Sequence, residues 1–121
     1  MLDRMIDVLV VDDTPDHLCL LQTNFERAGC TVRGTPTAEA AIAAYDLAAP
    51  DIAVIDLLLP GMDGWELANR VRVDLPDCAI VITSVLDVAD FPDAHALLPK
   101  PFTSAQVRKI LQDLMPTRAT I

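Results

Sequence analysis

The sequence predicts an α/β fold, a doubly wound sheet of five parallel strands, formed by a single domain that spans residues 1–121. Short apolar runs recur along the chain, and segments with apolar residues at helical spacing separate them. Such alternation produces right-handed crossovers and a parallel sheet that helices cover on both faces. A length of 121 residues suffices for one compact domain and leaves no room for a second.

The first part of the chain predicts two strands and two helices. Residues 8–11 form an apolar run that is typical of a buried parallel strand. A helix begins near Pro15, whose missing N–H costs nothing in the first turn, and Gly29 closes it. Residues 31–33 form a short second strand, and Thr37 can cap the helix that follows. The residues that these two helices should bury are Leu18, Leu21, Phe25, Ala38, Ala41, Ile42 and Tyr45.

The second part of the chain continues the alternation and interrupts it once. Residues 51–55, 79–82 and 95–98 are the third, fourth and fifth predicted strands. Between the last two, Pro92 and scattered acids break any long helical period. A helix from about 65 to 73 should bury Leu67, Ala68 and Val71, and a last helix, capped by Thr103 or Ser104, should bury Val107, Ile110, Leu111 and Leu114.

Composition and charge exclude several classes of function. Nine basic and eighteen acidic residues give a net charge of −9, which would repel a nucleic-acid backbone. Aspartates break the apolar runs far short of a bilayer span, and the charged residues 1–4 do not resemble a signal peptide. We therefore expect a cytoplasmic protein with no membrane segment and no direct nucleic-acid contact.

The cysteines indicate neither a zinc site nor a disulfide framework. Cys19, Cys30 and Cys78 are odd in number, far apart and without a Cys-x-x-Cys pair. We expect all three to be buried free thiols, because unpaired cysteine is most often found in protein interiors.

Polar side chains gather where the predicted strands end. Ligands of an open α/β sheet bind beyond the carboxyl ends of its strands. The residues at those ends are Asp12 and Asp13 after the first strand, Asp56 after the third, Thr83 after the fourth and Lys100 after the fifth. Any one of them could be an ordinary helix cap or surface residue. Five on one edge predict a site.

The chemistry of these five residues suits phosphoryl transfer with Mg²⁺. Three neighbouring carboxylates repel one another, and a hard divalent cation relieves that repulsion while keeping waters for other ligands. No His or Cys is expected in the cluster, which argues against zinc. Asp56 stands alone at a strand end and is the best nucleophile, whereas the pair Asp12-Asp13 suits the metal. Thr83 and Lys100 would compensate charge on the phosphoryl oxygens.

Four segments resemble the receiver domain of two-component response regulators. They are VLVVDD (8–13), IAVIDLLLPGMDG (52–64), IVITS (80–84) and KPF (100–102). The resemblance covers essentially the whole chain. It implies the flavodoxin-like (βα)5 fold for the doubly wound sheet.

The resemblance also implies a role for each residue of the site. Asp56 would be the phospho-acceptor, and Thr83 and Lys100 would grip the phosphoryl group. Mg²⁺ would be held by Asp12, Asp13, Asp56 and the backbone carbonyl of Leu58, with Asp13 as the direct ligand of the acidic pair and Asp12 acting partly through water. The Lys100-Pro101 bond would be cis.

Partners follow from the same resemblance. The phosphoryl donor would be a phosphohistidine on a histidine kinase or a phosphotransfer protein, and phosphorylation would switch the binding of a downstream effector protein. The chain would be a monomer or weak dimer. It would catalyse only its own phosphorylation and dephosphorylation, so it is not expected to be an enzyme.

Two departures from the family concern the output of the switch. Leu97 occupies the place where the family usually has an aromatic residue. Thr83 and Lys100 are only 17 positions apart (100 − 83), so with Pro92 between them the fourth helix should be shortened or absent. Leu58 and Val85 flank the site, and their apolar character suggests that they screen the aspartyl phosphate from water.

Three alternatives stay open at this point. The chain could be a stand-alone regulator, which its charged start favours, or a receiver piece of a hybrid kinase or transcription factor. It could be a receiver-like interaction module that is not phosphorylated. A Mg²⁺-dependent phosphatase would need a second acid two residues after its nucleophile, but Thr14 stands at that distance from Asp12. A stable phosphoryl adduct, turnover of a phosphate ester, or neither would separate these readings.

Overall fold

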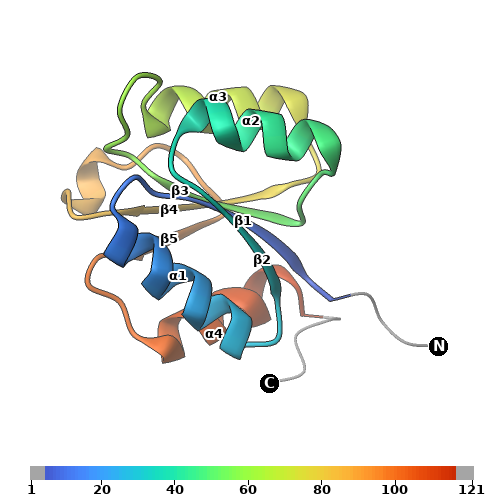
Figure 1. The fold of residues 1–121 in the computed structure, drawn as a ribbon. Helices are drawn as coiled ribbons and strands as arrows, with labels where there is room; N and C mark the ends of the chain where they lie inside the picture. Colours follow the sequence, from blue (N-terminus) through green and yellow to red (C-terminus); the bar gives the residue numbers. More distant parts are fainter. Residues whose placement is uncertain (1–4, 117–121) are drawn as a thin grey trace.

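The computed structural model describes residues 5–116 and has the predicted doubly wound α/β fold. In chain order the elements are β1 (Asp7–Val11), α1 (Pro15–Arg27), β2 (Thr31–Thr35), α2 (Ala38–Leu47), β3 (Ile52–Asp56), α3 (Gly64–Asp74), β4 (Ala79–Ser84), the 3₁₀-helix η1 (Val88–Asp90), β5 (Ala96–Pro99) and α4 (Ser104–Leu114). The strands pair in parallel in the order β2-β1-β3-β4-β5. Helices α1 and α4 cover one face of the sheet, and α2 and α3 cover the other (Figure 1).

Continuous apolar strands let the sheet bury both of its faces. Successive side chains of a strand point to opposite faces, so Val8 and Val10 pack toward α1 and α4 while Leu9 and Val11 pack toward α2 and α3. Every residue of β3 is buried, as expected for a central parallel strand. Each fully buried Leu or Phe contributes about 1.5–3 kcal/mol to this packing.

All five predicted strands differ from the structure by one or two residues at their ends. The first begins one residue earlier, at Asp7, and the fourth continues to Ser84. The second strand continues to Thr35, beyond the predicted residues 31–33. Gly34 interrupts the sequence pattern that is typical of a strand, so the prediction stopped before it. The third strand is one residue later than predicted and includes Asp56. The fifth begins at Ala96 because His95 stands just outside it, with its ring Nδ1 accepting a hydrogen bond from the Ile80 N–H at 2.8 Å.

Some burial predictions were wrong. Cys30 and Cys78 are buried free thiols, but Cys19 lies on the solvent-exposed side of α1. Leu18, Ile42 and Leu114 are only partly buried at the margins of the core. The charged residues 1–4 that we expected to lead into the first strand lie outside the described residues.

The segment between β4 and β5 contains no α-helix, as the sequence predicted. Its only helical turn within the described structure is η1. Trp65 of α3 holds that turn by donating a hydrogen bond from Nε1 to the Asp90 carbonyl at 3.2 Å. Leu86, Phe91 and Ala94 pack against the core on the α2 and α3 face. A short loop therefore covers this part of the sheet in place of a helix.

Within residues 5–116, no helix combines the length and the apolar character that crossing a bilayer requires.

Candidate functional site

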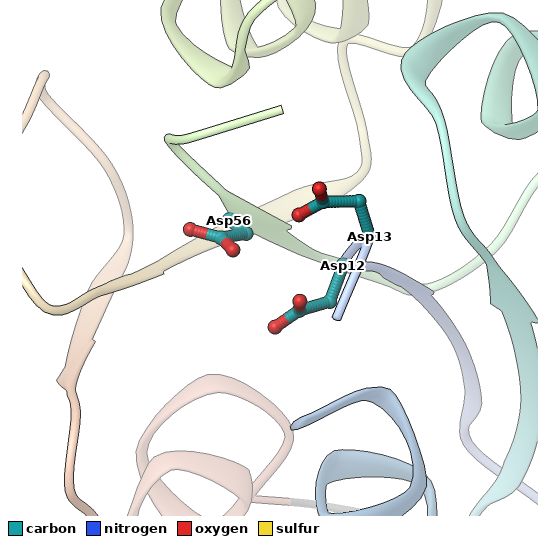
Figure 2. Close-up of side chains that lie close together, drawn as sticks. All are labelled: Asp12, Asp13 and Asp56. Atoms are coloured by element: carbon teal, nitrogen blue, oxygen red, sulfur yellow. The ribbon is translucent and has the colours of Figure 1, made fainter. Parts of the chain in front are cut away.

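Three carboxylates converge at one edge of the sheet. Strands β1 and β3 are neighbours with Val11 opposite Ile55, so the acids that follow Val11 and Ile55 reach the same edge. Oxygen atoms of Asp12, Asp13 and Asp56 all lie within 4.8 Å of one another (Figure 2). Asp12 and Asp56 are buried, whereas Asp13 is exposed. The cluster therefore opens to solvent on the Asp13 side.

Asp12 is held firmly by its surroundings. Its backbone N–H donates to the Thr35 carbonyl at 3.1 Å, which extends the β1–β2 ladder by one residue. Its Oδ1 accepts a hydrogen bond from the Thr14 N–H at 3.0 Å, and its Oδ2 lies 2.7 Å from Lys100 Nζ. Both carboxylate oxygens are thus oriented before any ligand arrives.

Asp56 is buried with less compensation. Its Oδ2 lies 3.3 Å from Lys100 Nζ, and its Oδ1 accepts from the Leu58 N–H at 3.2 Å. Burial raises the pKa of the Asp56 carboxyl; the Lys100 ammonium opposes the rise and the charge of Asp12 adds to it. The Asp56 carboxylate is therefore a charged group with an incomplete set of partners.

Thr83 and Lys100 complete the site from β4 and from the loop after β5. Thr83 is directly opposite Asp56 in the β3–β4 pairing. Its hydroxyl is fully buried and has no hydrogen-bond partner among the described residues. Leaving a buried hydroxyl unpaired costs about 1–3 kcal/mol, so such a group calls for an explanation. Lys100 precedes a cis Lys100-Pro101 bond, as the resemblance implied.

The loop after β3 is shaped by two glycines. A Cβ on Gly64 would lie only 2.2 Å from the Asp56 carbonyl oxygen, so no other residue fits there without a shift of the backbone. Gly61 has φ +70°, a value that L-residues rarely adopt. Asp63 then caps α3 by accepting the Glu66 N–H at 2.9 Å. These constraints hold Leu58 and its carbonyl in the turn beside Asp56.

Comparison with known proteins identifies the family. A family model described as the response regulator receiver domain matches residues 8–112. The chain belongs to this family.

Two curated relatives agree with this assignment. The receiver domain is 42% identical, over 59% of its length and 53% of the relative's, to an uncharacterized 14.6 kDa protein of Leptolyngbya boryana. It is 32% identical to the heme response regulator HssR of Staphylococcus aureus, over 66% of this chain and 36% of HssR. The matched region thus spans about half of the first relative and about a third of the second.

A solved structure agrees on the fold. The response regulator protein TrrA of Thermotoga maritima, in complex with Mg(2+)-BeF, superimposes with a TM-score of 0.84 at 23% identity, over 92% of this chain and 100% of that one. At this identity the likeness concerns the fold alone.

The structure of the receiver domain brings together all five side chains that the sequence singled out, and it adds one that the sequence did not. His17 in the first turn of α1 places its Nδ1 3.0 Å from Lys100 Nζ. His17 reaches the site through Lys100 and does not belong to the metal-binding candidates, which within residues 5–116 are the carboxylates of Asp12, Asp13 and Asp56. His17 and Lys100 are 83 residues apart, and only the three-dimensional arrangement of α1 and the loop after β5 shows the contact.

The two apolar residues that we expected to screen the site are exposed at the surface. Leu58 is 48% exposed and Val85 is 63% exposed, while the Asp56 that they flank is buried. Screening of an aspartyl phosphate by these side chains stays a prediction.

The carboxylate set fits Mg²⁺ better than a softer metal. All three candidate ligands are hard carboxylate oxygens, and no cysteine belongs to the group within residues 5–116. The Lys100 ammonium pairs with Asp12 and Asp56, and the nearby Asp13 adds a third carboxylate, which leaves negative charge for a divalent cation to neutralise. The exposure of Asp13 leaves room for the waters that Mg²⁺ keeps.

Proposed function

We propose that this receiver domain accepts a phosphoryl group on Asp56 in two-component, or phosphorelay, signal transduction. The observation that carries the proposal is the meeting of a buried Asp56 carboxylate, the Lys100 ammonium and an unpartnered Thr83 hydroxyl at one strand edge. Mg²⁺ would be held by Asp12, Asp13, Asp56 and the Leu58 carbonyl. When bound, it would supply positive charge for the phosphoryl oxygens.

The transfer would convert a phosphohistidine into an aspartyl phosphate. An oxygen of Asp56 forms the new bond to phosphorus while the bond from phosphorus to the donor imidazole nitrogen breaks. The electron pair of the broken bond stays on that nitrogen. Thr83 donates a hydrogen bond to one phosphoryl oxygen and Lys100 compensates the charge of another. The chain would thus promote only its own phosphorylation and dephosphorylation.

The response to phosphorylation would be local. Leu97 has no ring to enter the space that a moving Thr83 would leave, and no α-helix lies between β4 and β5 to be displaced. We expect the change in residues 83–93 and 100–102, with effector proteins reading this loop or helices α1 and α4. Amide hydrogen exchange with and without beryllofluoride would test this, and a change across α4 with an unaltered loop would contradict it.

The wider setting follows from charge and family. A histidine kinase or phosphotransfer protein would supply the phosphoryl group in the cytoplasm, with the chain as a monomer or weak dimer. A net charge of −9 disfavours direct contact with nucleic acid.

Intact-mass measurement tests the acceptor. With acetyl phosphate and Mg²⁺, the wild type should gain the mass of one phosphoryl group and Asp56→Asn should gain none. Asp51→Asn, at the opposite end of the sheet, is the matched control and should label like the wild type. Equal labelling of Asp56→Asn would contradict the assignment. A wild type without any adduct would favour a receiver-like interaction module.

A further inference from the structure

The Lys100 ammonium has three partners, and one of them has no place in the proposed chemistry so far. Nζ lies 2.7 Å from Asp12 Oδ2, 3.3 Å from Asp56 Oδ2 and 3.0 Å from His17 Nδ1. The first two partners are carboxylates, the groups with which an ammonium ordinarily pairs. The third is a ring nitrogen from a different element, in the first turn of α1.

The chemistry of the two groups fixes the direction of the third contact. A lysine ammonium has three N–H donors and no acceptor. His17 Nδ1 must therefore offer its lone pair, which requires a neutral ring with its proton on Nε2. One N–H of Lys100 is satisfied by each of its three partners.

We propose that His17 is a positioning residue for phosphoryl acceptance, acting through Lys100; this rests on the function proposed for Asp56. Lysine has a flexible side chain whose ordering is costly. With one N–H on Asp12 and another on His17, the remaining N–H is directed at Asp56, where the phosphoryl oxygens would lie. The Lys100 side chain is only 8% exposed, consistent with such a fixed orientation.

The surroundings of His17 favour this contact over competition from water. His17 and Lys100 line a cavity of about 260 Å³ at the surface. Its other lining residues are the apolar Leu20, Val85, Pro101 and Phe102. Lys100 is the one charged side chain among the described residues that line it, with Asp12 and Asp56 beyond it and Asp16 adjacent on α1.

Protonation of His17 would remove the contact. An imidazolium has no lone pair at Nδ1, and its positive charge would repel the ammonium at 3.0 Å. At a pH low enough to protonate the ring, Lys100 should therefore lose its fixed orientation. The affinity of the site for a phosphoryl group should decrease as a result.

Two variants of His17 distinguish a role as a hydrogen-bond acceptor from a role in packing alone. His17→Asn keeps an oxygen acceptor near the position of Nδ1, whereas His17→Leu keeps the bulk without an acceptor. Binding of beryllofluoride in the presence of Mg²⁺, followed by ¹⁹F NMR, should be weaker in His17→Leu by about fivefold, the size of one net hydrogen bond. His17→Asn should stay within about twofold of the wild type.

The pH profile provides a second readout that a packing role would not change. On acidification the wild type should lose affinity faster than His17→Asn, which shares every other titrating group. Equal affinities of wild type and His17→Leu, His17→Asn as weak as His17→Leu, or identical pH profiles for wild type and His17→Asn would each overturn the proposal.

NMR of the histidine ring tests the contact without any phosphoryl group. In ¹⁵N spectra of the wild type, His17 Nδ1 should be unprotonated and should shift on Lys100→Met. A proton on Nδ1, or no shift, would overturn the proposal. Should Asp56 take no label in the wild type, the function would fail, and the ring spectra would still decide whether His17 holds Lys100.

Discussion

Both ends of the sheet carry acidic residues, but the two ends differ in how completely those acids are paired with partners. At the amino-terminal end, Asp7 pairs with Arg33 at 2.9 Å, and Asp51 Oδ2 accepts the Asp7 N–H at 2.8 Å. At the carboxyl-terminal end, three carboxylates lie together, but the Lys100 ammonium pairs with only two of them, Asp12 and Asp56. The buried Thr83 hydroxyl has no partner among the described residues.

This difference shows where a binding site differs from a structural cluster. A structural cluster pairs each charge with a partner that the chain itself provides. The carboxyl-terminal cluster has more negative charge and more hydrogen-bonding capacity than its own residues satisfy, which costs stability until a ligand arrives. The presence of acids alone would not distinguish the two ends, but the number of partners that each acid has does.

The largest expected effect is on the reactivity of a cysteine, and it tests whether solvent is excluded from the amino-terminal end of the sheet. Burial raises the pKa of the Cys78 thiol, which lies just before β4, to about 12. From an ordinary value of 9.0, this lowers the thiolate population at pH 8 by about three orders of magnitude. Iodoacetamide should therefore modify the exposed Cys19 far faster than Cys78, as peptide mass mapping would measure. Similar rates at the two thiols would show that this end opens to solvent.

The next largest effect is on Mg²⁺ affinity, which should depend on the acids at the carboxyl-terminal end of the sheet and not on those at the amino-terminal end. Asp13→Ala should weaken Mg²⁺ binding by about 100-fold, since even the loss of an outer-sphere partner can cost that much. Asp51→Ala is the control and should leave the affinity unchanged, because its carboxylate belongs to the other end of the sheet. Isothermal titration calorimetry measures both, and an Asp13→Ala protein with wild-type affinity would remove the basis for the comparison.

Stability without metal should change with opposite sign at the two ends. Asp56→Asn should raise the free energy of unfolding at neutral pH, on the order of 1 kcal/mol, by removing a buried charge. Asp51→Ala should lower it by about 1 kcal/mol, by leaving the Asp7 N–H without its acceptor. Urea unfolding in a chelator measures both values.

The pH dependence of that gain follows from the direction of the Asp56 pKa shift. The pKa of Asp56 is raised in the folded state, chiefly by burial, so folding favours the protonated acid. Its contribution to stability is therefore present at low pH and is lost as pH rises through the folded-state pKa. The advantage of Asp56→Asn should disappear on acidification through the same range. An advantage that grows on acidification would contradict the shift.

The smallest effect concerns the ion pair at the amino-terminal end. Asp7 and Arg33 are partly exposed, so Arg33→Ala should cost about 0.5 kcal/mol in thermal or urea unfolding, and less at high salt. A cost of several kcal/mol would mean that this end, too, depends on a buried charge network.

The sequence predicted what depends on strand order and missed what depends on side-chain direction. Because parallel strands present their carboxyl ends on one edge, the positions of Asp56 and Thr83 followed from the order of apolar runs alone. The exposure of Cys19 depended on which side of α1 faces the sheet, where apolar and polar residues mix. The contact of His17 with Lys100 required the rotamers of two residues on separate elements.

The hydrogen bond from Trp65 to Asp90 makes the intrinsic fluorescence of Trp65 a probe of the loop between β4 and β5. Trp65 is the single tryptophan of the chain, and it touches the loop in which we expect the response to phosphorylation. Indole fluorescence depends on the polarity and hydrogen bonding around the ring, so a loop that leaves Trp65 should change both intensity and emission maximum. The kinetics of phosphorylation and of its reversal could then be followed in real time in the unlabelled wild-type chain.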